Sequence, residues 1–387
     1  MVAYIVSTDQ HAGAFDEDRW YDEINEVLIK EIEKDKTVRL VLLGGDWFHK
    51  KLSANSKAMK LAIKALIKIL KVCGKRGTIV RMIKGTHSHD NNQLDLFEPL
   101  VGSDLCDFKI FRTVSSEVIP FAGGAVKILY LPEEYMENQE EYYKEYFNDT
   151  YDMVLGHGLV DKASFISQVI ETETPRPDAP VFKVDDLESI CKGPIYFGHI
   201  HKRMVAGRFK YVGSHSVWGF GEEEEKGFIK GSINLRTKEF TDKYINNDLR
   251  PLYQTIVFKG EDPIFSLPVD RAISKLLQRA STINHELGDK IRYKLEIPVN
   301  YENDIMLTKL LNEVFSNIPH VQLMIKNKSQ LISEEQEDDE INELVERYYM
   351  LFDPALSYEE RLQLFIQIKH GKNIDLEFIK DSIHKEK

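Results

Sequence analysis

The stretch VRLVLLGGDWFH, residues 38–49, runs through apolar side chains almost without a break and then ends in two glycines, an aspartate and a histidine. A short run rich in Val and Leu that stops at glycine predicts a buried strand. Asp46 and His49 follow directly after this strand. The stretch therefore predicts a buried sheet with polar side chains at the end of one of its strands.

Five other segments have the same form, an apolar run that stops at Gly, Asp or His: AYIVSTD (3–9), GTIVRMIKG (77–85), YDMVLGHG (151–158), GPIYFGHIH (193–201) and KYVGSHS (210–216). Amphipathic patterns between some of them predict helices over 18–34 and 55–74. Alternating strands and helices predict an α/β domain with a largely buried sheet. Ligands of such sheets bind in the loops that follow the carboxyl ends of the strands. The Asp and His residues that end these apolar runs lie in such loops.

The chain has 387 residues, enough for two domains and an appendage. We expect the α/β domain to span 1–246 and a small α/β capping domain to span 247–329, with strands at 252–260, 290–299 and 320–328 around two helices. Residues 330–387 begin with an acidic run and continue with apolar residues at helical spacing. They predict an acidic linker and a helical tail.

Composition excludes several classes of protein. The sequence has no apolar run near the roughly 20 residues of a membrane span, and it begins without signal-peptide features. Three widely spaced cysteines, Cys73, Cys106 and Cys191, argue against a disulfide framework and a thiolate zinc site. We therefore expect a cytoplasmic protein with no membrane contact. The net charge of −12 does not exclude a nucleic-acid partner, because residues 331–387 alone carry 15 acidic and 7 basic side chains.

Five strand ends carry imidazoles and carboxylates, and seven of the chain's twelve histidines lie in them: Asp9 and His11 in TDQH, Asp46 and His49 in GGDWFH, His87, His89 and Asp90 in GTHSHD, His157 in LGHG, and His199 and His201 in FGHIH. One such pair is an ordinary turn, but the five together indicate a metal centre. Two divalent cations about 3.5–4 Å apart can clamp a phosphoester and activate a water. Imidazole with carboxylate suits Mn, Fe or Zn.

These motifs, D-x-H, GD, HD, GH and GHxH in this order, resemble those of the calcineurin-like metallophosphoesterases. LGGDWFHKKLS (43–53) and YVGSHSVWGFGEEEEKGF (211–228) resemble segments of the SbcD-type nucleases of DNA double-strand-break repair, which occur in bacteria and phages. The resemblance covers residues 1–230, and reaches the cap and tail only through their architecture. It implies a metallophosphoesterase-type β-sandwich flanked by helices.

The resemblance also implies roles for individual residues. Asp9, His11 and His201 would hold one metal ion, and His157 and His199 the other. Asp46 would bridge the two ions. His49 would lie near the scissile phosphate and orient the catalytic histidine. The cofactor would be two divalent ions, Mn²⁺ first, with Mg²⁺, Fe or Zn as alternatives. Basic residues beside the motifs are candidate DNA contacts: Lys50, Lys51, Lys202, Arg203 and Arg208.

The segment GTHSHD, residues 85–90, is two residues longer than the family's G-N-H-D, in which the Asn ligates a metal and the His is catalytic. Alignment from Asp90 puts Ser88 at the ligand position and His89 at the catalytic one, with Asp90 behind it. Alignment from the glycine puts Thr86 and His87 there instead. We prefer the first, because an adjacent carboxylate fixes the tautomer and orientation of an imidazole. The amide ligand is absent in both, so Ser88 through its hydroxyl or His87 through a ring nitrogen would replace it.

The function implied is a manganese-dependent DNA nuclease subunit, a 3′-to-5′ exonuclease on duplex DNA and an endonuclease on single-stranded or hairpin DNA. Such nucleases form homodimers and act with an SMC-like ATPase, which here would dock on the C-terminal helices. Two alternatives remain open: a phosphodiesterase or phosphatase for small or protein phosphoesters, and a non-catalytic scaffold of the same fold. The segment GDWFHKK lacks the GDxxDRG arginine that protein phosphatases of this fold usually carry, which argues against that branch.

Overall fold

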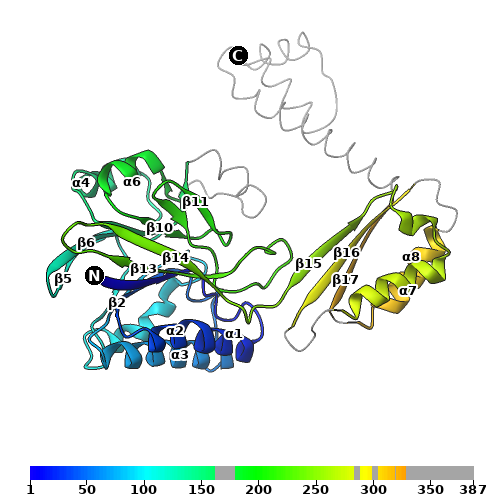
Figure 1. Cartoon of the computed structure of the whole chain (residues 1–387), viewed down its shortest axis with the longest axis horizontal. Helices are drawn as coiled ribbons and strands as arrows, with labels where there is room; N and C mark the ends of the chain where they lie inside the picture. Colours follow the sequence, from blue (N-terminus) through cyan, green and yellow to red (C-terminus); the bar gives the residue numbers. More distant parts are fainter. Residues whose placement is uncertain (162–178, 283–287, 299–303, 319, 328–387) are drawn as a thin grey trace, which may run out of the picture. The chain divides into compact units, whose positions relative to one another are not determined.

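The computed structural model describes residues 1–161, 179–282, 288–298, 304–318 and 320–327. These residues divide into two compact units (Figure 1). Unit 1 holds the described residues up to Gln254 together with 288–290, and unit 2 holds the described residues of 255–282 and 291–327. The division thus falls after Gln254, whereas the sequence patterns placed it at residue 246.

Unit 1 contains two six-stranded mixed sheets. The first sheet has the order β14 (Phe240–Asn246), β13 (Gly227–Ile233), β1 (Val2–Ser7), β2 (Val38–Gly44), β3 (Ile79–Ile83) and β4 (Phe108–Phe111). Strands β1, β2, β3 and β4 run parallel to one another, β13 is antiparallel to β1, and β14 is antiparallel to β13. The second sheet has the order β11 (Met204–Ala206), β12 (Phe209–Tyr211), β10 (Ile195–Gly198), β7 (Met153–His157), β6 (Gly124–Leu131) and β5 (Ser115–Phe121).

The two sheets share one apolar core, to which strands of both contribute buried side chains such as Leu42 and Leu155. Helices cover the outer faces. Those on the first sheet are α1 (Glu17–Glu23), the π-helical η1 (Ile24–Ile29), α2 (Lys30–Lys34) and α3 (Lys57–Gly74). Those on the second are α4 (Gln139–Phe147) and α6 (Val184–Ile190). Burial on both faces explains the almost unbroken apolar runs of the central strands.

The sequence patterns located the central strands but missed others. The hairpin β5–β6 and the antiparallel pair β13–β14 are absent from the predicted set. Three further elements of unit 1 are the 3-10 segment η2 (Asn91–Leu100) and the short strands β8 (Leu159–Val160) and β9 (Val181–Phe182). In this mixed α/β unit, the ends of β1, β2, β3, β7 and β10 carry the motifs singled out above.

Unit 2 is a three-stranded sheet with two main helices, as predicted for this part of the chain. The sheet order is β15 (Tyr253–Phe258), β16 (Lys290–Ile297) and β17 (Val321–Asn327), and the other elements are η3 (Pro263–Ser266), α7 (Val269–Ala280) and α8 (Asp304–Phe315). Apolar side chains of α7, α8 and the strands form its core. The predicted linker and tail, 330–387, lie outside the described residues.

Two expectations from composition can be compared with the described part of the chain. Each helix there is too short or too polar to cross a lipid bilayer. Cys73, Cys106 and Cys191 are all buried and unpaired, in agreement with the absence of a disulfide framework.

A hydrogen-bonded pair of tyrosines links the two sheets, and its removal provides a test of the packing. The Tyr4 and Tyr196 hydroxyls lie 2.8 Å apart in the core, and the Tyr196 hydroxyl donates to Asp242 at 2.6 Å. Tyr196→Phe leaves the Tyr4 hydroxyl without this partner, so we expect the free energy of unfolding to fall by about 1–3 kcal/mol. Urea unfolding followed by tryptophan fluorescence measures it, because all three tryptophans lie in unit 1.

The double variant Tyr4→Phe/Tyr196→Phe is the control. It removes both hydroxyls, so part of the lost stability should return, while Lys210 keeps its contact with Asp242 at 2.6 Å. A single variant as stable as the parent protein would contradict a structural role for the pair.

Candidate metal centre

Several predicted metal ligands at the carboxyl ends of strands have a strained backbone. Asp9, His11, Asp46 and His199 all have positive φ, at 52°, 48°, 51° and 91°. A side chain with a Cβ rarely adopts this conformation, and each instance costs on the order of 1–3 kcal/mol. Lys238, at 59°, is the one other non-glycine residue with positive φ in the described part of the chain. Strain concentrated in the predicted ligands indicates that their positions serve a function.

A first group of ligands consists of Asp9, His11 and His201, whose donor atoms lie within 4.8 Å of one another. Asp46 adjoins it, with its Oδ2 3.7 Å from His11 Nε2. Asp9 Oδ2 and His11 Nε2 are buried and have no hydrogen-bond partner among the described residues. Because burial without a partner is costly for a polar atom, this pair fits a bound cation.

A second group consists of Glu133, His157 and His199, again with donor atoms within 4.8 Å of one another. The Thr86 hydroxyl lies among them, 3.2 Å from Glu133 Oε2 and 3.3 Å from both His157 Nε2 and His199 Nδ1. Asp46 adjoins this group as well, because its Oδ2 is 3.3 Å from His157 Nε2.

Asp46 is therefore shared by both groups, as expected for a bridging carboxylate. Its Oδ2 also lies 2.8 Å from His89 Nδ1, and its Oδ1 accepts a hydrogen bond from the Thr86 amide at 2.6 Å. Burial by itself would raise the pKa of Asp46, but His157 and His89 outweigh that effect and hold the pKa well below its usual range. The carboxylate is thus ionised and available to cations on both sides.

Hydrogen bonds orient two of the histidines. His157 Nδ1 lies 2.8 Å from the Gly44 carbonyl, and His201 Nδ1 lies 2.7 Å from Glu222 Oε1. Each contact places the ring proton on Nδ1 and leaves Nε2 as the nitrogen that can bind a metal. Burial, and next the neighbouring His201, lower the pKa of His11, so its ring is neutral and can also serve as a ligand.

The structure corrects the expected role of Ser88. Ser88 and His87 are exposed, whereas Thr86 points into the second group and His89 reaches Asp46. The His89 and Asp90 amides both donate to the Thr86 carbonyl at 3.0 Å, so the two additional residues form a turn that projects outward. Each alignment was half right: counting from the glycine finds Thr86, and counting from Asp90 finds His89.

Asp90, which was expected to fix the orientation of the His89 ring, accepts hydrogen bonds from the backbone. Asp90 accepts hydrogen bonds from the backbone amides of Asp46 at 3.0 Å, Gly85 at 2.8 Å and Phe48 at 3.2 Å. It is fully buried, and burial together with the nearby Asp46 raises its pKa to about 7. Asp90 therefore positions the loop that carries Asp46, and Asp46 itself contacts the His89 ring.

Glu133 is the site residue that the sequence analysis missed. It lies in LPEEY, residues 131–135, directly after β6, and its side chain is 2% exposed. Burial would raise its pKa, but the hydrogen bond with His199 overcomes that effect and lowers it. The signal was the same as at the other strand ends, an apolar run that stops at a potential ligand.

His49 and the basic residues occupy the edge of the centre. The His49 ring lies nearly parallel to that of His89, with centroids 5.5 Å apart, and its Nδ1 is 3.3 Å from His11 Nδ1. Lys50, Lys51 and Lys202 are exposed.

Two arginines flanking the motifs have partners within the protein. Arg203 lies over the Tyr244 ring at 4.4 Å and 3.5 Å from Glu225. Arg208 donates to the backbone carbonyls of Glu188 and Cys191.

The combined donor set can hold metal ions. It comprises three carboxylates that are at most 2% exposed, Asp9, Asp46 and Glu133, together with His11, His157, His199 and His201. Carboxylate and imidazole together match first-row divalent cations. A cation there would offset the cost of burying three neighbouring carboxylates.

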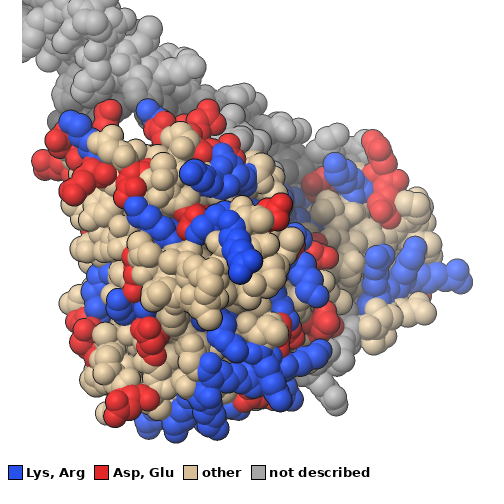
Figure 2. Space-filling view, turned by 60° about the vertical axis from the view of Figure 1, so that its left-hand side comes forward, with Lys and Arg blue, Asp and Glu red and all other residues tan. Residues whose placement is uncertain are grey.

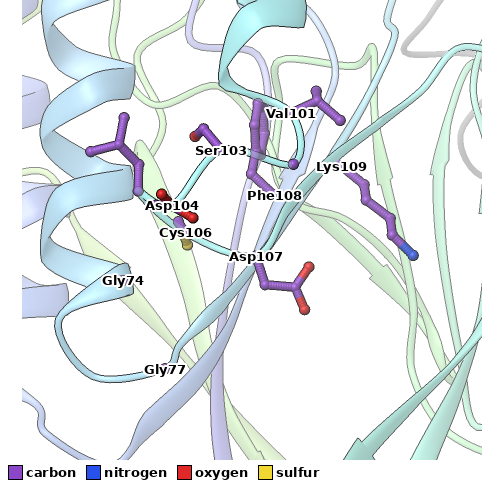
Figure 3. Close-up of a pocket in the computed structure, with 11 residues that line it drawn as sticks. Gly74, Gly77, Val101, Ser103, Asp104, Cys106, Asp107, Phe108 and Lys109 are labelled. Atoms are coloured by element: carbon purple, nitrogen blue, oxygen red, sulfur yellow. The ribbon is translucent and has the colours of Figure 1, made fainter.

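A separate surface pocket of about 460 Å³ lies at the C-terminal end of α3 (Figure 3). Its lining includes Gly74, Asp104, Asp107 and Lys109. The pocket adjoins the amino-terminal end of β4. The metal ligands follow the carboxyl ends of strands that run parallel to β4, so the pocket and the metal centre lie at opposite ends of these strands. Asp107 pairs with Arg81 at 2.8 Å.

Comparison with known proteins adds little to this geometry. No protein-family model and no curated protein sequence matches the chain. The solved structure of TT1561 from Thermus thermophilus is similar over 63% of this chain and 98% of its own, with 10% identity and a TM-score of 0.33. A second solved structure covers 62% of this chain and 98% of its own, with 10% identity and a TM-score of 0.35. Likeness at this level carries no conclusion about function.

The position of Glu133 leads to a prediction about metal binding. Glu133→Gln removes one charge from the second group and leaves Asp9, His11 and His201 intact. We expect one class of Mn²⁺ site to weaken by about 10-fold or more and the other to remain unchanged. Isothermal titration calorimetry on metal-stripped protein measures both classes.

Glu134→Gln is the matched control. Glu134 is adjacent in sequence, but it accepts hydrogen bonds from the Val114 amide at 2.6 Å and the Tyr142 hydroxyl at 2.9 Å. Equal Mn²⁺ binding by both variants and the parent protein would remove Glu133 from the ligand set.

Proposed function

We propose that this chain is a two-metal phosphodiesterase of the calcineurin-like metallophosphoesterase fold and that its substrate is DNA. The observation that carries the proposal is the shared carboxylate, Asp46, which lies against two adjacent groups of potential ligands. Asp9, His11 and His201 would hold one ion, and Thr86, Glu133, His157 and His199 the other. Two ions in these positions would polarise a phosphoester and lower the pKa of a water molecule.

Side chains of the protein would position the phosphoester and donate a proton to its leaving oxygen. His89 is partly exposed, at 18% of its side chain, and contacts the shared carboxylate. It can therefore reach a bound phosphate and give a proton to the leaving oxygen. His49 stacks nearly parallel on the His89 ring and can help to hold its orientation. Lys50, Lys51 and Lys202 are exposed near the motifs and can meet neighbouring phosphates.

DNA is favoured over small or protein phosphoesters by the segments 43–53 and 211–228, which resemble those of the SbcD-type nucleases. By the same resemblance we propose manganese as the metal, 3′-to-5′ exonuclease and endonuclease activities, a homodimer, and an SMC-like ATPase partner for the tail. A non-catalytic scaffold is disfavoured, because strained ligands and unpartnered buried atoms are costly to keep without a bound ion.

Nuclease assays on end-labelled linear duplex DNA test the proposal. The parent protein should release nucleotides only when Mn²⁺ is supplied. Asp46→Ala removes the carboxylate common to both groups and should abolish release, and His89→Ala should slow it at least 100-fold while leaving DNA binding intact.

His87→Ala is the control, because His87 is exposed two residues before His89 and should keep full activity. Full activity in Asp46→Ala would overturn the proposal. Hydrolysis of a small phosphodiester such as bis(p-nitrophenyl) phosphate, without any cleavage of DNA, would favour the small-substrate alternative.

A further inference from the structure

The chain contains a long segment without acidic residues. Between Asp46 and Asp90 there are eleven Lys and Arg and no Asp or Glu. In the whole chain 63 of 387 residues are acidic, about one in six, and the net charge is −12. The segment is therefore strongly basic within an acidic protein, and it starts and ends at two residues of the metal centre.

Most of these basic side chains lie on one face of α3. Lys57, Lys60, Lys64, Lys68 and Lys71 recur every three or four residues, and Lys75 continues the series at the end of the helix. This spacing keeps them on a single face of an α-helix. We call these six lysines the α3 stripe. The opposite face of the helix, including Leu66, Ile69 and Leu70, is buried against the first sheet.

The α3 stripe is largely open to solvent. All of its lysines are exposed except Lys68, which is half-buried. Lys57 pairs with Asp18, and Lys64 lies over the Tyr21 ring at 4.4 Å. Figure 2 shows Lys and Arg side chains gathered along the lower edge of unit 1, the edge at which α3 lies in Figure 1.

The closely spaced lysines of the α3 stripe lower the stability of the helix. Like charges three or four residues apart destabilise a helix by about 0.2–0.5 kcal/mol per pair. Acidic side chains would be favoured in its first turn, which has none. A polyanion lying along α3 would reverse these repulsions, so the stripe suits a negatively charged partner.

The stripe begins next to the metal centre. The loop from His49 to Ser56 leads into α3 and carries the exposed Lys50 and Lys51. Gly13, two residues after His11, is so close to this region that a Cβ there would lie 2.7 Å from Leu52 and 3.7 Å from Ala58, in the first turn of α3. From this end the stripe extends for about 27 Å, at a rise of about 1.5 Å per residue.

We propose that the α3 stripe binds the phosphate backbone of duplex DNA and guides the strand leaving the metal centre. Its length equals about eight base-pair steps of about 3.4 Å. The inference rests on the proposed nuclease function and adds to it a binding surface outside the ligand loops. The contacts are to phosphates, so they supply affinity and register without sequence preference.

The test compares two triple variants in the full chain. One is Lys60→Gln/Lys64→Gln/Lys71→Gln in the stripe. The control is Lys144→Gln/Lys183→Gln/Lys192→Gln, which removes the same charge from exposed lysines on and beside α4 and α6. Both are made in the Asp46→Ala background, so that DNA binding can be measured without cleavage.

Fluorescence anisotropy with a 30-base-pair duplex gives the affinity at several NaCl concentrations. Each lost phosphate contact lowers the slope of log K against log salt by about 0.9, so the stripe variant should lose about 2–3 units of slope. Its affinity at low salt should fall at least 10-fold, and the control should bind as the parent does. Equal slopes in the two triple variants overturn the inference.

A further measurement separates this inference from the proposed function. With Asp46 restored, the stripe variant should hydrolyse bis(p-nitrophenyl) phosphate at the parent rate and digest DNA with a higher KM. Stripe-dependent DNA binding in a parent that cleaves no DNA would support the stripe and overturn the nuclease proposal. No DNA binding by the parent at low salt would overturn both.

Discussion

The geometry of the candidate metal centre depends on the carboxylate of Asp46, because this carboxylate adjoins both ligand groups. Its position is set from three directions. The Thr86 amide donates to Oδ1, the His89 ring contacts Oδ2, and Asp90 accepts a hydrogen bond from the Asp46 amide. The residue keeps a strained backbone at φ 51° under this combined constraint.

Close contact between two loops makes that constraint possible. A Cβ on Gly85 would lie 2.2 Å from the Asp46 amide nitrogen, and a Cβ on Gly45 would lie 2.7 Å from the Gly85 Cα. Both positions therefore require glycine, and Gly45 also has φ +89°. The loops after β2 and β3 can meet only because their parallel strands end at the same edge of one sheet. The buried sheet thus supplies the rigidity that positions the strained ligands.

The two ligand groups differ in one respect, the Thr86 hydroxyl, which comes from the segment 85–90. Its oxygen lies 3.2 Å from Glu133 Oε2 in the second group. The same segment closes the acid-free region that contains α3, so the ligand loops and the basic helix are consecutive parts of one stretch of chain.

The sequence by itself determined the central buried strands, the α/β class of unit 1 and most of the residue types of the metal centre. An apolar run predicts a buried strand, and the Asp or His at its end is a potential ligand. Asp9, His11, Asp46, His157, His199 and His201 were all recognisable in this way. Only the tertiary structure decided between Thr86 and Ser88, since the direction of a side chain in a turn depends on which carbonyl closes it. It also decided that Glu133, which follows the apolar run of β6, belongs to the centre. The run shows that a strand ends there, but only the stacking of the two sheets shows that this strand end meets His157 and His199.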